Sequence, residues 1–168
     1  MQRISLRDFV IVRQLELDIS HGFSVLSGET GAGKSILIDA LQLVLGARAD
    51  AGVVREGALR TEISAGFAAG VVVNQWLKDN GFDESDELLL RRSIDTQGKS
   101  RAWINGSAAT AAQLREIGDQ LVDIHGQHAW QSLTKPSAVR GLLDAYAGVD
   151  SRSLQQVWDE WRTAQHTL

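Results

Sequence analysis

Gly28-Glu29-Thr30-Gly31-Ala32-Gly33-Lys34-Ser35 is the stretch of this 168-residue chain that decides its fold. Glycines stand at its first and sixth positions, and lysine and serine follow, which completes the phosphate-binding pattern known as Walker A. Glycines let the backbone turn sharply and bring successive amides around an anion. A glycine-rich turn without a ligand is the alternative, and the complete match disfavours it.

The residues on both sides of this loop predict the strand and the helix that the pattern requires. Residues 23–27 are interpreted as a short buried strand that ends at Gly28. After Gly33, apolar residues recur at helical spacing, and Gly46 offers a carboxy-terminal cap. We therefore predict a strand, a loop and a helix in immediate succession. The apolar helix positions are Ile36, Leu37, Ala40, Leu41, Val44 and Leu45.

The rest of the chain predicts regular structure almost throughout. Two antiparallel strands joined near Asp8 precede the loop, and a turn at His21-Gly22 follows them. Asn105-Gly106 is a strong hairpin dipeptide, and Thr110 is placed to cap a helix that runs to about Leu121. The tail from Ser137 onward is predicted to be helical. Further strands are expected at residues 61–67, 87–94 and 101–104, with a short helix at 73–80.

Composition limits the class of protein. With 43% hydrophobic residues the chain can bury the core of one ordinary domain, and the net charge of −4 argues against a uniformly basic surface for nucleic acid. The absence of cysteine excludes disulfides and thiolate metal sites. No apolar run reaches the roughly 20 residues that cross a bilayer. We expect a cytoplasmic protein that does not contact a membrane.

The loop predicts ATP and Mg²⁺ as ligands, with GTP as the alternative nucleotide. Lys34 would reach the β- and γ-phosphates, and the Ser35 hydroxyl would ligate Mg²⁺. Asp123-Ile124-His125-Gly126-Gln127 fits the Asp-x-x-Gly-Gln arrangement of small GTPases. No Asn-Lys-x-Asp guanine-reading motif occurs in the sequence, and the two motifs lie far apart. We therefore predict that the bound nucleotide is ATP.

No segment matches a Walker B strand, which delivers an aspartate to the magnesium. Residues 118–123 are polar where a buried strand needs apolar side chains, and Ile124 stands where a catalytic glutamate would follow. Residues 141–144 match no better. We therefore expect the isolated chain to bind ATP with little or no hydrolysis.

The last helix carries a heptad-like pattern. Its apolar residues follow alternating steps of three and four, which is typical of a coiled coil, while an amphipathic helix packed on its own domain is the alternative. The pattern is still running at the last residue, which suggests a piece of a longer protein. We predict a head lobe at residues 1–150 and the root of a coiled-coil arm at 151–168. The residues of the pattern are Leu154, Val157, Trp161, Ala164 and Leu168.

Several blocks of the sequence carry a family resemblance. They are Leu6-Arg7-Asp8-Phe9-Val10-Ile11, residues 27–41, Leu45-Gly46-Ala47-Arg48-Ala49-Asp50, Arg101-Ala102-Trp103-Ile104-Asn105-Gly106 and Asp123-Ile124-His125-Gly126-Gln127-His128. Over nearly its whole length the chain resembles the RecN family of bacterial DNA repair ATPases, relatives of the structural-maintenance-of-chromosomes (SMC) proteins. The resemblance implies the amino-terminal lobe of an α/β P-loop head of ABC/SMC type. Such a lobe has an antiparallel β subdomain, the Walker A strand, loop and helix, and the start of a coiled-coil helix.

The resemblance also assigns site residues. Gln127 matches the Q-loop glutamine, which contacts Mg²⁺ and the attacking water, so Lys34 and Gln127 are the expected catalytic residues and Ser35 and Gln127 the expected metal ligands. Arg7 and Arg55 fall where similar heads place arginines near the nucleotide. His125 and His128 lack a third metal ligand and are expected to shape the loop beside Gln127. The remaining nucleotide contacts are expected from Gly28, Glu29, Thr30, Gly31, Ala32, Gly33, Lys34, Ser35 and Ile36.

Finally, the resemblance implies partners. A carboxy-terminal lobe would supply the signature motif and Walker B, and two heads would engage through bound ATP as a homodimer. The full-length assembly would act on DNA in recombinational repair of double-strand breaks. The alternatives are a self-contained GTPase and an ATP-regulated assembly module without significant turnover.

Overall fold

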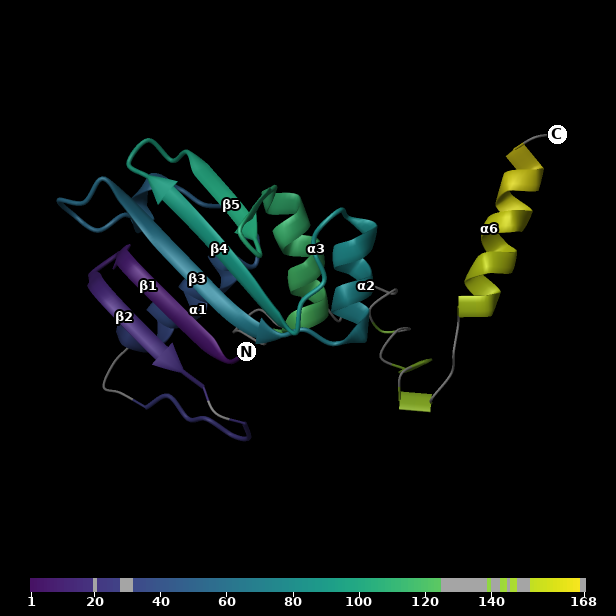
Figure 1. Cartoon of the computed structure of the whole chain (residues 1–168), viewed down its shortest axis with the longest axis horizontal. Coiled ribbons are helices and arrows are strands. Elements are labelled where there is room, and N and C mark those ends of the chain that lie inside the picture. Colours follow the sequence, from purple (N-terminus) through teal and green to yellow (C-terminus); the bar gives the residue numbers. More distant parts are fainter. Residues whose placement is uncertain are drawn as a thin grey trace. The chain divides into compact units, whose positions relative to one another are not determined.

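The computed structural model describes residues 1–19, 21–27, 32–124, 139, 143–144, 146–147 and 152–166. The chain divides into two compact units, Met1–Asp123 and Ile124–Leu168, and each is described by itself (Figure 1). The predicted boundary at residues 150 and 151 stays a prediction.

The first unit is built on one six-stranded sheet in the order β2-β1-β3-β4-β5-β6 (Figure 1). Every neighbouring pair of strands is antiparallel. All the predicted strands outside residues 23–27 are present. The bounds are β1 Arg3–Phe9, β2 Val12–Asp18, β3 Arg60–Ala68, β4 Glu87–Asp95, β5 Ser100–Ile104 and β6 Ser107–Ala109.

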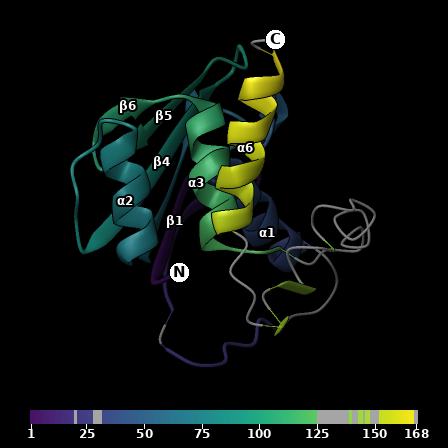
Figure 2. The ribbon, with the colours of Figure 1, turned by 90° about the vertical axis from the view of Figure 1, so that its right-hand side faces the viewer.

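Helices cover one face of this sheet. α1 (Ala32–Val44) leads through a short 3-10 helix, η1 (Ala51–Val53), toward β3. α2 (Val71–Asp79) and α3 (Ala111–Leu121) lie side by side in front of the strands (Figure 2). The predicted helices after the loop, around residue 75 and after Thr110 are therefore confirmed.

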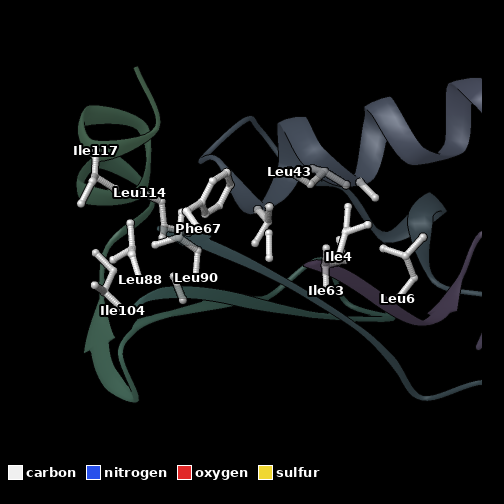
Figure 3. Close-up of a cluster of buried hydrophobic side chains, with 14 of the residues drawn as sticks. Ile4, Leu6, Leu43, Ile63, Phe67, Leu88, Leu90, Ile104, Leu114 and Ile117 are labelled. Atoms are coloured by element: carbon white, nitrogen blue, oxygen red, sulfur yellow. The ribbon is translucent and has the colours of Figure 1, made fainter. Parts of the chain in front are cut away.

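The core lies between these helices and the sheet, because alternate strand residues point to the same face. In β4, Leu88 and Leu90 are fully buried while Leu89 between them is exposed. From the helical side, Leu114 of α3 lies near these two leucines, and Leu43 of α1 lies above Ile4 and Ile63 (Figure 3). Burying each such side chain contributes about 1.5–3 kcal/mol. Other members of the core are Ile4, Leu6, Ile63, Phe67, Ile104 and Ile117.

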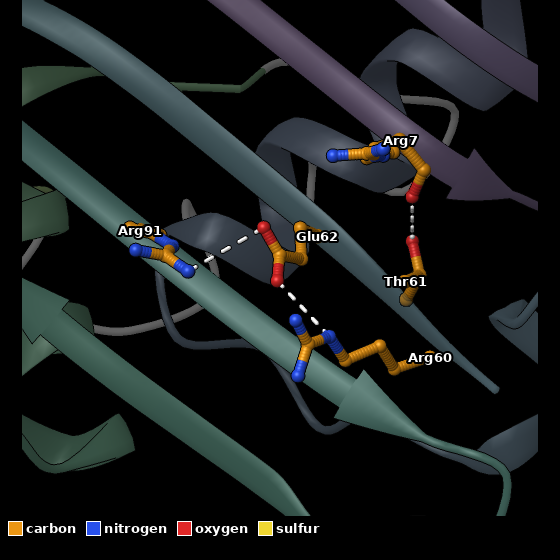
Figure 4. A network of polar contacts seen from close by, with 5 residues as sticks. All are labelled: Arg7, Arg60, Thr61, Glu62 and Arg91. Atoms are coloured by element: carbon orange, nitrogen blue, oxygen red, sulfur yellow. Dashed lines mark hydrogen bonds and ion pairs between the residues drawn. The ribbon is translucent and has the colours of Figure 1, made fainter.

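The opposite face, which we call the open face, is polar. Glu62 of β3 forms an ion pair with Arg60 Nε at 3.1 Å and accepts a hydrogen bond from Arg91 Nη2 at 3.4 Å (Figure 4). The Arg91 guanidinium carbon lies 4.8 Å from the centre of the Trp103 ring. Such pairs at an exposed surface contribute about 1 kcal/mol or less each. The sheet is therefore stabilised mainly from its helical side.

Local signals set the turns. Asn105 and Gly106 both have positive φ, 48° and 84°, as a two-residue hairpin turn between β5 and β6 requires. Thr110 forms a capping box with Gln113 at the start of α3, as predicted. The turn between β1 and β2 consists of Val10 and Ile11, two residues beyond the predicted position near Asp8.

The strand predicted at residues 23–27 is wrong. The structure assigns these residues no strand, and Phe23, Val25 and Leu26 are 103%, 82% and 53% exposed. A strand is stable only when a neighbour pairs with its amides and carbonyls. None of the described strands pairs with residues 23–27, so these residues have the composition of a strand but no neighbouring strand.

In the second unit, α6 spans Arg152–His166, which confirms the predicted helix over these residues. The Trp158 and Trp161 rings lie 5.0 Å apart, and both side chains are exposed, as are Leu154 and Val157. Pairing of α6 in a coiled coil stays a prediction. Among the described residues, no helix combines the length and apolar character needed to span a membrane.

Candidate nucleotide-binding site

The amino-terminal end of α1 is the centre of the candidate site. Residues 28–31 of the phosphate loop lie outside the described residues, and so do the side chains of Ala32 and Lys34. The helix begins at Ala32, so its first amides have no carbonyl partner within the helix. The helix dipole adds about half a positive charge at this end. Unpaired amides and positive potential together favour a bound phosphate.

Gly33 has a feature that packing within the described residues does not explain. A Cβ atom added there would meet nothing within 4 Å. Glycine inside a helix costs about 1 kcal/mol relative to alanine, so open space alone would favour alanine. Close approach of a ligand to the backbone is one use of glycine at such a position.

Two residues of the first turns of α1, Ser35 and Ile36, differ in exposure. Ser35 is exposed, so its hydroxyl is accessible to a metal ion at the start of the helix. Ile36 is only 8% exposed and packs in the core with Ala40 and Val44. Ile36 can therefore contact a phosphate only through its backbone, and its side chain anchors the helix on the sheet.

A magnesium ion fits this position on chemical grounds. Mg²⁺ binds few protein oxygens and completes its octahedral shell with water and substrate phosphates. Among the described residues no three histidine or acidic side chains gather as a metal site. The exposed Ser35 hydroxyl in the first turn of α1 is the kind of ligand that such an ion uses. Gln127, His125 and His128 lie outside the described residues, and their predicted roles stay predictions.

Arg55 is held at the end of β1 by Asp8. Its Nε donates to Asp8 Oδ1 at 2.9 Å, and its backbone amide donates to the Asp8 carbonyl at 2.9 Å. The Val10 amide donates to the Val53 carbonyl at 2.9 Å, which ties the segment after η1 to the same corner. Arg55 keeps 34% of its side chain exposed. No described residue bonds its Nη atoms, so that edge of the guanidinium can meet an anion.

Asp8 binds the candidate residue Arg55, and the sequence prediction did not include it. It has a positive φ of 50°, and it binds a residue 47 positions away. An aspartate next to a predicted turn is a weak signal, because most such residues simply cap the turn.

Arg7, the neighbour of Asp8, has a different position. Alternation along β1 places Arg7 on the open face, since Leu6 points into the core. Its side chain lines a hollow of about 210 Å³ with Gln14, Glu62 and Arg91. The Arg7 carbonyl accepts from Thr61 Oγ1 at 2.8 Å (Figure 4). The structure thus brings Arg55 beside Asp8 and leaves Arg7 on the face opposite the one that α1 covers.

The fold and this helix end together define a nucleotide-binding domain of the AAA class. The sequence model described as "AAA domain" matches residues 3–128. The chain belongs to the AAA domain family.

Within that class the chain is similar to the DNA repair protein RecN. It is 43% identical to RecN of Vibrio cholerae serotype O1 over 172 aligned positions, which cover all of this chain and 31% of that protein. RecN of Bacillus subtilis is 40% identical over 95% of this chain and 28% of its own length. The chain therefore spans about a third of the length of the curated relatives that it matches.

Solved structures agree on the fold. The Smc head domain with a coiled coil and joint from Pyrococcus yayanosii aligns with a TM-score of 0.66 at 23% identity, covering 99% of this chain and 36% of that one. A chain from work on ATP-driven dimerization and DNA-stimulated activation of SMC ATPases aligns with a TM-score of 0.62 at 24% identity, covering 85% and 96%. The predicted fold class, the amino-terminal lobe of an SMC-like head, is confirmed.

Proposed function

We propose that this chain is the ATP- and Mg²⁺-binding lobe of an SMC-like ATPase that acts in recombinational DNA double-strand break repair. The observation that carries the proposal is the exposed amino-terminal end of α1, with open space at Gly33 and an accessible hydroxyl at Ser35. It is supported by membership of the AAA domain family and by the similarity to RecN.

Each residue has one role in the proposed site. The amides from Gly28 to Ile36 surround the β-phosphate, Lys34 neutralises the β- and γ-phosphates, and Ser35 ligates Mg²⁺. Arg55, oriented by Asp8, adds a positive charge near the phosphates. Gln127 contacts Mg²⁺ and orients the attacking water. Because β1 is an inner strand, Arg7 would reach the nucleotide around the end of β1, where Asp8 and Arg55 lie.

Hydrolysis is proposed to need a second lobe that supplies Walker B and the signature motif. The exposed apolar residues Phe23, Val25 and Leu26 support this, because they have the composition of a strand and no strand partner. Two ATP-bound heads would then close as a homodimer, and DNA would be bound by the full-length assembly.

Titration of the chain with a fluorescent ATP analogue and Mg²⁺ tests the binding proposal. We expect wild-type chain to bind and Lys34→Ala to lose binding, because the β- and γ-phosphates lose their cation. Lys78→Ala is the matched control, since Lys78 also lies on a helix and its only described ion pair is an exposed one with Glu84 at 3.6 Å. Equal binding by wild type and Lys34→Ala would contradict the proposal.

Three further measurements separate the alternatives. Competition between ATP and GTP decides the nucleotide, and a clear preference for GTP would favour the self-contained GTPase. Turnover by the isolated chain at rates typical of complete ATPases would contradict the need for a second lobe. The mass of a longer protein that contains both lobes, measured with and without ATP, tests head engagement and the assembly-module alternative.

A further inference from the structure

Arg92 is a buried arginine that the proposed site does not use. It lies on β4 between Leu90 and Ile94, on the face that the helices cover, and is 3% exposed. Burying a guanidinium ion is costly unless its donors are satisfied. No acidic side chain among the described residues pairs with it. Its position therefore depends on neutral acceptors.

Those acceptors come mainly from one place. Arg92 Nη1 donates to the Leu43 carbonyl at 2.6 Å and to the Ala47 carbonyl, and Nε donates to Ser100 Oγ at 2.8 Å. Leu43 lies in the last turn of α1, and Ala47 follows its end. The Arg92 guanidinium thus joins β4 and β5 to the carboxy-terminal end of α1. The phosphate loop precedes the amino-terminal end of the same helix.

The electrostatics of this end explain the choice of a cation. The last carbonyls of a helix lack amide partners within it and carry about half a negative charge. Burial lowers the pKa of Arg92, and the positive charge of Arg115 lowers it further. Arg115 itself donates from Nη2 to the Gly46 carbonyl at 3.4 Å. Two cations therefore face the negative end of α1.

The end of α1 is also closely confined. A Cβ at Gly46 would lie 2.6 Å from the Ala111 carbonyl oxygen and 2.6 Å from the Arg115 amide nitrogen, so α3 packs directly on this turn. Gly118 of α3 is similarly close to Leu45, at 3.1 Å from a built Cβ to Leu45 Cβ. The carboxy-terminal end of α1 cannot move along its axis without breaking these contacts.

We propose that Arg92 is a positioning residue of the nucleotide site. A 13-residue helix is a rod of about 20 Å, so fixing one end sets where the other end lies. By binding the Leu43 and Ala47 carbonyls, Arg92 fixes the position of α1 along its own axis. That position determines where the first amides of α1, Lys34 and Ser35 lie relative to the phosphates. Sites that bind phosphate through backbone amides depend on such placement, because a small misplacement weakens every bond at once. The inference rests on the proposed ATP-binding function.

The test compares Arg92→Lys and Arg92→Met with Ile94→Val. Lysine keeps the charge but has one donor group, which cannot span three acceptors in the fork geometry. Methionine fills the space without a donor. Ile94 is fully buried on the same strand and face but its side chain has no hydrogen-bond donor, so Ile94→Val perturbs the core without removing a hydrogen bond to the α1 carbonyls. Each protein is titrated with a fluorescent ATP analogue and Mg²⁺ at a temperature where it is folded, and amide hydrogen exchange is followed at residues 36–40, the first amides of α1 that have carbonyl partners within the helix.

We expect both Arg92 variants to raise the Kd for the analogue by at least about five-fold, the lower range for coupling between distant sites. Exchange at residues 36–40 should rise in the same variants without nucleotide, because these amides depend on the hydrogen bonds of α1. Ile94→Val should leave both readouts near wild type, and Arg92→Lys should be less affected than Arg92→Met. If folded Arg92→Lys and Arg92→Met bind with the wild-type Kd, the positioning role is overturned while the proposed function stands. If the wild-type chain binds no analogue, both proposals fall.

Discussion

Gly46→Ala should be one of the most damaging single substitutions at the surface where α1 meets α3. Gly46 has a φ of +94°, and an added Cβ would lie within 3 Å of three backbone atoms, Ala111 O, Arg115 N and Arg115 Cα. These atoms belong to a helix and cannot rotate away as a side chain could. Relief therefore requires α3 to move from the end of α1.

The magnitude can be worked from a matched glycine. Gly81 follows α2 as Gly46 follows α1, and its φ is +76°, but nothing lies within 4 Å of its built Cβ. Gly81→Ala should lose about 1–2 kcal/mol, the penalty for a side chain in the left-handed region. Gly46→Ala should lose that penalty and a further ~1–3 kcal/mol for overpacking, so roughly 2–5 kcal/mol altogether.

Urea unfolding followed by tryptophan fluorescence and far-ultraviolet circular dichroism measures both losses. The difference between the two variants isolates the close approach of α3, because the backbone penalty is common to both. Equal losses for Gly46→Ala and Gly81→Ala would refute the packing described at the end of α1, and with it the confinement on which the positioning role of Arg92 depends.

Two further predictions concern a helix cap and an ion pair. Thr110→Ala should destabilise the chain by about 1 kcal/mol, since the amide at the third position of α3 loses its acceptor, and Thr110→Ser should retain most of the stability in the same unfolding experiment. Arg55→Ala should change the free energy of unfolding by no more than about 1 kcal/mol, because the pair with Asp8 is partly exposed, yet it should weaken binding of ATP with Mg²⁺. Asp8→Asn should weaken the same binding less, since it leaves the Arg55 charge in place, and unchanged affinity in Arg55→Ala would remove Arg55 from the site.

The predictable part of the fold depended on short-range signals. Helical spacing after Gly33, the Asn105-Gly106 dipeptide and the Thr110 cap each involve residues within a few positions of one another, and all three are confirmed. The failed strand at residues 23–27 has equally clear composition. It was wrong because a strand depends on a neighbour that local composition does not contain.

The candidate site also has a part that the sequence predicted and a part that only the structure showed. The loop motif located the start of α1 and the exposed Ser35, but it did not indicate which residue would hold Arg55. Asp8 lies 47 positions before it, and a positive φ at Asp8 is not readable from the residue type alone. The sequence also placed Arg7 near the nucleotide by resemblance, whereas strand alternation puts its side chain on the open face.

By itself the sequence determined that this chain holds a Walker A loop at the start of a helix, because motif and spacing are local properties. Its place among the SMC-like lobes came from the resemblance of whole sequence blocks to a known family. The structure places Arg92 on the buried face of β4 together with Leu88, Leu90 and Ile94, and the sequence analysis did not single it out. Only the tertiary structure decided what that arginine binds. Its acceptors at Leu43 and Ala47 lie 49 and 45 positions away, and the folding of the sheet against α1 is what brings them together.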